Sequence, residues 1–146
     1  MAGNTPMKLD RSWQLKSIEA LEKRGYGDPT TAPTPLVRKC LEYVKLPVSE
    51  LSVEQLRLLI GQEIGLSYLI PLALTVLETN IVAEGDMYPG DLLKNVTVVN
   101  ASFWKNTPEQ YARLVALMKK GKRRLGQYEL KVSIPDISNP SPPKNS

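Results

Sequence analysis

The apolar segment 51–80, LSVEQLRLLIGQEIGLSYLIPLALTVLETN, constrains the fold of this chain more than any other stretch. From Leu66 to Leu77, apolar residues recur at helical spacing and cover nearly the whole circumference, which places this helix inside a domain. Pro71 lies within the run, and fewer than about 18 apolar residues are continuous, too few to span a bilayer. The pattern predicts a buried central helix at about residues 64–79.

Helix-start signals predict further helices on both sides of the central one. Thr34 precedes a proline at the first helical position, and Ser52 has a glutamine three residues later. The segment 107–110, TPEQ, combines a cap residue, a proline and an acid, while Asn100 can cap a short turn. Pro89 is placed to open another short helix. The prediction is an all-α fold.

The composition suggests one compact domain between two less ordered ends. We expect a flexible N-terminus over residues 1–9 and a single helical domain over 10–126. Residues 127–146 are rich in proline and serine, which predicts a loose, largely disordered tail. The glycines Gly61 and Gly65 mark a tight joint before the central helix, although small residues there would also let a partner approach.

The reactive residue types argue against an enzyme. The chain has no histidine and a single cysteine, Cys40, which falls on an apolar helical stripe and is expected to be buried and inert. No phosphate-binding loop, nucleophile motif or metal-ligand spacing is present, so we expect no catalytic residue, no cofactor and no metal. The first residues have no apolar signal region, which favours a cytoplasmic protein without membrane association.

The net charge of +4 hides two segments of opposite sign. Residues 51–104 carry six acidic and two basic side chains, a net −4, whereas residues 105–146 carry nine basic and three acidic, a net +6. The basic segment 119–131 could contact phosphates, but it has few interleaved aromatics and also suits the negative end of a helix. Nucleic-acid binding is therefore an alternative function rather than the preferred one.

The loop AEGDMYPGD, residues 83–91, is the best candidate for a binding site. A loop fixed by proline and glycine that presents acids and an aromatic residue is suited to protein recognition. The competing interpretation is that its aromatic residues only pack against the central helix. The predicted partner-contact residues are Glu84, Asp86, Tyr88, Asp91 and Trp104, with Glu63 as a weaker addition.

Three segments then show a resemblance to a known family. IGQEIGLSYLIPLAL (60–74), AEGDMYPGDLL (83–93) and FW (103–104) resemble, in this order, the immunity proteins of bacterial contact-dependent growth inhibition systems. The resemblance covers roughly residues 36–118. One departure is Ile81, where relatives tend to have proline after the asparagine, and the region after Arg124 matches nothing in the family.

The resemblance implies a non-enzymatic inhibitor that binds the toxic C-terminal domain of a large secreted effector, one to one. Many such toxin domains are nucleases with basic clefts, which an acidic surface would complement. The basic C-terminal part could instead meet an acidic surface of the toxin. Replacing both Asp86 and Asp91 with lysine is expected to weaken toxin binding without disturbing the fold.

Overall fold

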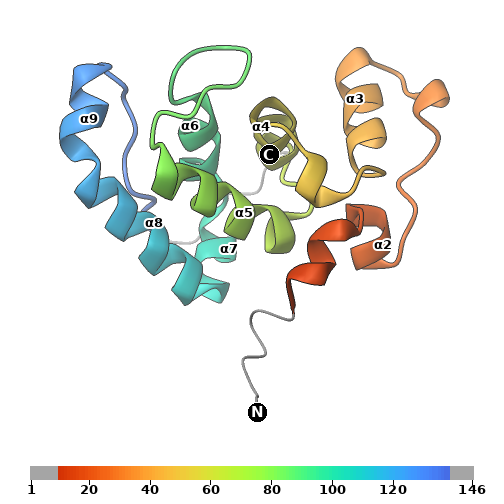
Figure 1. Cartoon of the computed structure of the whole chain (residues 1–146), viewed down its shortest axis with the longest axis horizontal. Coiled ribbons are helices and arrows are strands. Elements are labelled where there is room, and N and C mark those ends of the chain that lie inside the picture. The colour runs from red at the N-terminus through yellow and green to blue at the C-terminus, as the bar shows by residue number, and fades with distance from the viewer. Residues whose placement is uncertain (1–9, 139–146) are drawn as a thin grey trace. The chain divides into compact units, whose positions relative to one another are not determined.

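The computed structural model describes residues 10–138, which contain eight α-helices, three 3-10 helices and no β-strand (Figure 1). This confirms the predicted all-α fold. Contacts between Cα atoms divide the chain into two units, Met1–Ser52 and Val53–Ser146. The expected single domain over residues 10–126 stays a prediction, and the expected flexible segment 1–9 lies outside the described residues.

The first unit consists of short helices held by side-chain caps. Thr34 accepts a hydrogen bond from the N–H of Val37 at 3.1 Å, so the predicted start at Thr34-Pro35 is confirmed. Cys40 is buried as expected, and this burial raises the pKa of its thiol. The elements of this unit are η2 (Asp10–Leu15), α2 (Ile18–Glu22), η3 (Pro29–Thr31), α3 (Pro35–Tyr43) and η4 (Val48–Glu50).

The second unit is built around α5 (Leu66–Thr79), which packs against α4, α6 and α8 (Figure 1). The predicted central helix is confirmed, because five apolar residues of α5, from Leu69 to Leu77, are buried. Pro71 lies inside the helix. The other helices of this unit are α4 (Val53–Gly61), α6 (Asp91–Thr97), α7 (Ala101–Asn106), α8 (Pro108–Lys120) and α9 (Lys122–Gln127).

The joint between α4 and α5 requires glycine for two different reasons. A Cβ atom on Gly61 would lie 2.8 Å from Nδ2 of Asn95, so the absence of a side chain lets α4 approach α6. Gly65 has a φ of +64°, a conformation that favours glycine, and precedes the first residue of α5. The prediction of a tight helix–helix corner is confirmed.

One helix start and one side-chain cap differ from the sequence-based expectation. The helix expected at Pro89 begins at Asp91, because Gly90 takes a φ of +90° and stands before the first helical residue. The hydroxyl of Thr107 does not cap α8 but donates 2.8 Å to the carbonyl of Phe103 in the preceding helix. The cap at Asn100 is as predicted, with its side chain accepting from the N–H of Phe103.

Residues 128–138 come after α9 within the second unit and form neither a helix nor a strand. The hydroxyl of Tyr111 donates to the carbonyl of Pro135 at 2.8 Å, and the side chain of Leu130 lies against Gly90. The rest of the predicted disordered tail, residues 139–146, lies outside the described part of the chain.

Among residues 10–138, no helix combines the length and the apolar character that crossing a membrane would require.

Candidate partner-binding loop

The acidic loop, residues 83–91, connects α5 to α6 and extends beyond α6 (Figure 1). Its two ends are paired. Glu84 and Pro89 form an antiparallel bridge, and the N–H of Gly90 donates to the carbonyl of Val82 at 3.1 Å. The loop is therefore closed at its base rather than open chain.

Asp91 holds this loop from inside. Its side chain is only 2% exposed, and its carboxylate accepts three backbone N–H groups. The N–H of Gly85 donates to Oδ1 at 2.7 Å, while those of Met87 and Tyr88 donate to Oδ2 at 2.9 and 3.3 Å. A carboxylate at the first position of α6 also favours the positive end of that helix. Asp91 thus organises the loop.

Two residues of α4 complete the support of the loop. Oε1 of Glu54 accepts the N–H of Asp86 at 2.7 Å. Arg57 makes a two-point contact with Glu54, at 2.7 and 2.6 Å, and its Nε lies 3.7 Å from Oδ2 of Asp91. The hydrogen bond to Glu54 raises the pKa of the Arg57 guanidinium, with smaller contributions from Asp91 and Asp86. One cation, Arg57, therefore contacts both acids that hold the loop and offsets part of their charge.

Gly85 is required by the close approach of the loop to α4. A Cβ atom there would collide with Oε1 of Glu54 and would lie 3.2 Å from the Cα of the same residue. Backbone atoms cannot yield as a flexible side chain can. The conformation of the loop therefore depends on glycine at this position.

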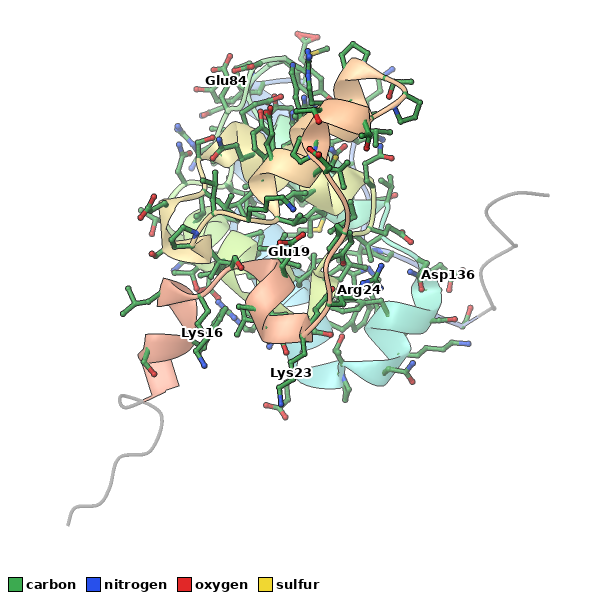
Figure 2. The ribbon with its side chains drawn as sticks, turned by 90° about the vertical axis from the view of Figure 1, so that its right-hand side faces the viewer. Lys16, Glu19, Lys23, Arg24, Glu84 and Asp136 are labelled. Atoms are coloured by element: carbon green, nitrogen blue, oxygen red, sulfur yellow. The ribbon has the colours of Figure 1, made fainter. Side chains whose placement is uncertain are left out.

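The outer surface of the loop presents two acids and two large apolar side chains. Glu84 and Asp86 are exposed, and Figure 2 shows Glu84 at the edge of the molecule. Met87 is 65% exposed and Tyr88 is 41% exposed. Tyr88 was predicted from the sequence, whereas Met87 was not. Exposed tyrosine and methionine are enriched in protein-binding surfaces.

Two of the predicted contact residues point inward. Asp91 is buried within the loop, and Trp104 is fully buried, with its ring near those of Phe103 and Tyr111. The burial of Trp104 favours the competing interpretation, in which this side chain packs inside the domain rather than contacting a partner. The structure also corrects the expectation for Asp91→Lys, because a lysine there would remove the acceptor of three loop N–H groups.

Glu63 lies at the end of α4, away from the loop in sequence. It takes a φ of +57°, and its carboxylate accepts the backbone N–H and the side-chain amide of Asn100 at 3.0 and 3.1 Å. Glu63 therefore connects the α4–α5 joint to the cap of α7. The structure does not bring it together with Glu84, Asp86 and Tyr88 through any of these contacts.

The loop has the chemistry of a recognition surface. Within residues 10–138, no group of three or more potential ligand side chains is arranged to hold a metal ion. What the loop presents outward is negative charge and apolar surface on a backbone held in one conformation. Such an arrangement suits a macromolecular partner with a basic, partly apolar surface.

A model of the family of CDI immunity proteins matches residues 20–114, well over half of the chain. The chain therefore belongs to this family, which confirms the resemblance inferred from its three motifs. Membership implies an immunity protein that neutralises a cognate toxin. No curated protein and no solved structure matches the chain significantly.

Proposed function

We propose that this protein binds the C-terminal toxin domain of a secreted effector in the cytoplasm, one to one, and neutralises it by covering it with the acidic loop. The observation that carries this proposal is the loop itself. A buried carboxylate and Glu54 together hold four of its N–H groups, while two acids, Met87 and Tyr88 remain outside. An inhibitor of this kind acts by occupying a surface and needs no catalytic group.

The charge of the surrounding segment supports a nuclease as the partner. Residues 51–104 carry a net −4, and an enzyme that binds RNA or DNA has a basic cleft. An acidic surface would be attracted to that cleft and would accelerate the encounter. The exposed side chains of Met87 and Tyr88 would then supply the apolar contacts that slow dissociation.

The proposed contact residues are Glu84, Asp86, Met87 and Tyr88, with Asp91 in a supporting role. Glu84 and Asp86 determine the charge, and their exposure means that each alone contributes modestly. Tyr88 is the expected energetic centre, because an exposed aromatic ring with a hydroxyl that becomes buried on binding is a frequent hot-spot residue. Trp104 and Glu63 are assigned to the interior packing and to the α4–α7 connection.

The test is calorimetric titration of the protein with the toxin domain encoded beside it, at low and at high salt. The variant Asp86→Lys/Tyr88→Ala should weaken binding roughly 30-fold, which corresponds to about 2 kcal/mol. A second variant, Glu84→Lys/Asp86→Lys, should lose mainly the salt-dependent part. Its matched control is Glu42→Lys/Glu50→Lys, which makes the same charge change at exposed residues outside the loop.

The outcomes separate the candidate functions. Tight one-to-one binding that only the loop variants weaken would support the proposal. Equal affinities for wild type, loop variants and control would reject the loop as the contact surface. Absence of toxin binding, together with salt-sensitive binding to RNA through residues 119–131, would support the nucleic-acid alternative instead.

A further inference from the structure

A groove with a volume of about 690 Å³ lies in the second unit, between the end of α5 and the α8–α9 segment. Residues 77–81 form one side, and residues 113–124 form the other. A volume of this size accommodates several side chains of a partner. The proposed role of the acidic loop does not involve this groove.

The floor of the groove is apolar. Leu77 and Ile81 line it from the α5 side, and Ala116 and Leu117 line it from α8. Gly121 also lines the groove, and its lack of a side chain lets the α8–α9 joint lie directly on Ile81; a Cβ atom there would collide with Cδ1 of that isoleucine. The floor is thus a packed surface, suited to an apolar side chain.

The walls of the groove are charged, and their charges are not balanced. Across the groove, Arg113 contacts both carboxylate oxygens of Glu78, at 2.9 and 3.2 Å, and this pairing lowers the pKa of Glu78. This pair leaves no net charge. Lys120 and Arg124 line the same side as Arg113, and within the described part of the chain no carboxylate forms an ion pair with either. The groove therefore carries a surplus of two positive charges.

The cationic wall also lies beyond the family pattern. The match to the family model ends at residue 114, so Ala116, Lys120 and Arg124 are outside it, while the α5 side of the groove is inside it. A groove with one side inside the family match and a cationic wall outside it is suited to distinguishing one toxin from another, since specificity requires contacts that other partners cannot satisfy.

We propose that this groove is a second docking site for the toxin and that it binds an acidic segment in which carboxylates flank one apolar side chain. This inference rests on the proposed function. Lys120 and Arg124 contact the carboxylates, Arg124 through the planar guanidinium that pairs well with them. The apolar side chain fills the floor between Leu77 and Leu117. The protein thus offers the toxin an acidic loop and a basic groove.

Charge complementarity favours an acidic peptide segment over a nucleic acid. Strands of RNA or DNA are bound by extended basic surfaces with aromatic side chains on which bases stack. The groove has an aliphatic floor, and none of its lining residues is aromatic. Tyr128 lies nearby, but its ring is under the guanidinium of Arg124, 5.5 Å away, rather than in the groove.

The first experiment compares two charge-reversal pairs that differ only in position. Lys120→Glu/Arg124→Glu changes the groove, and Lys119→Glu/Arg123→Glu makes the same change on neighbouring exposed residues that do not line it. Both pairs alter the net charge equally, and each replaces one basic residue in the last turn of α8. The groove pair should weaken toxin binding roughly 10- to 100-fold, and the control pair by less than about threefold.

A second pair of variants tests the floor without changing any charge. Ala116→Trp places a large side chain in the groove, whereas Ala112→Trp places it one helical turn earlier on α8, at an exposed residue that does not line the groove. Only the first should weaken toxin binding. Thermal unfolding of all four variants checks whether each retains the wild-type fold.

The proposal fails if wild type binds the toxin tightly but the groove variants bind as well as their controls. It also fails if wild type binds a labelled single-stranded RNA, the groove pair abolishes that binding and toxin affinity is unchanged. If wild type does not bind the toxin at all, the proposed function itself is refuted. This result is distinguishable from a failure of the groove proposal, in which wild type still binds the toxin tightly.

Discussion

Replacing Asp91 with alanine should destabilise the acidic loop and the helix that follows it. The mutation removes the acceptor of three N–H groups, at 2.7, 2.9 and 3.3 Å, and the ion pair of 3.7 Å with Arg57. A hydrogen bond to a charged group contributes about 1.5–3 kcal/mol when its partner is left unpaired. The two shorter hydrogen bonds, from the N–H groups of Gly85 and Met87, therefore determine most of the expected loss of stability.

The expected loss is about 3 kcal/mol of unfolding free energy, toward the lower end of the sum of the two bonds. The reason is the location of the donors. The N–H groups of Met87 and Tyr88 belong to exposed residues, so water can replace part of what the carboxylate provides. Arg57 keeps its two-point contact with Glu54 and is not left without a partner.

Urea unfolding measures the free energy, and amide hydrogen exchange locates the change. The N–H groups of Gly85, Met87 and Tyr88 should lose protection together, while those of α8 keep theirs. Asp91→Asn is the informative control, because its single carbonyl oxygen can serve only one side of the loop and should lose roughly half as much. Asp136→Ala, at an exposed acid, should leave stability unchanged.

A loss below about 1 kcal/mol for Asp91→Ala, with unchanged exchange at the three amides, would refute this reasoning. It would mean that Pro89, Gly90 and the bridge at the base of the loop determine its conformation without the carboxylate. Loss of toxin binding at full stability would also be informative, since it would assign Asp91 a contact role that its burial argues against.

Two further predictions concern aromatic side chains. Trp104 is fully buried and its Nε1 has no hydrogen-bond partner among the described residues, so Trp104→Ala should cost about 3–5 kcal/mol in urea unfolding. Trp104→Phe should cost less than half of that, because it removes an N–H that forms no bond; equal losses would contradict this. Burial, and then the hydrogen bond to Glu22, raise the pKa of Tyr26 from 10.0 to about 12. The protonated phenol is favoured in the fold, so its contribution to stability is complete below pH 10 and is lost as the pH rises toward about 12. Absorbance titration should show one late phenolate that Tyr26→Phe removes, and its absence in wild type would refute the assignment.

Local signals in the sequence predicted the helices well but the side-chain roles in the loop less well. The start at Thr34-Pro35 depends on two adjacent residues, and the burial of α5 depends on a periodic pattern, so both could be predicted. Asp91 carries the same local signal as Asp86, an acid in a turn. Its burial arises only when the chain folds back and three N–H groups converge on it.

The groove also could not be predicted from the sequence, because the residues that line it are far apart in the chain. Its two sides come from residues 77–81 and 113–124, which only the packing of α5 against α8 brings together. From the sequence, Lys120 and Arg124 belong to an undivided basic run and cannot be distinguished from Lys119 and Arg123. The helical register and the break at Gly121 separate the residues that line the groove from those that do not.

The four hydrogen bonds that hold the acidic loop have a kinetic consequence. Because Asp91 and Glu54 already fix the backbone, the free protein needs no slow rearrangement before it meets its partner. Association should then follow a single exponential at every toxin concentration, with a rate constant that rises linearly and falls with added salt. An immunity protein that must act before its toxin damages the cell would benefit from such speed, and in the proposed complex the buried acid would provide it without touching the toxin.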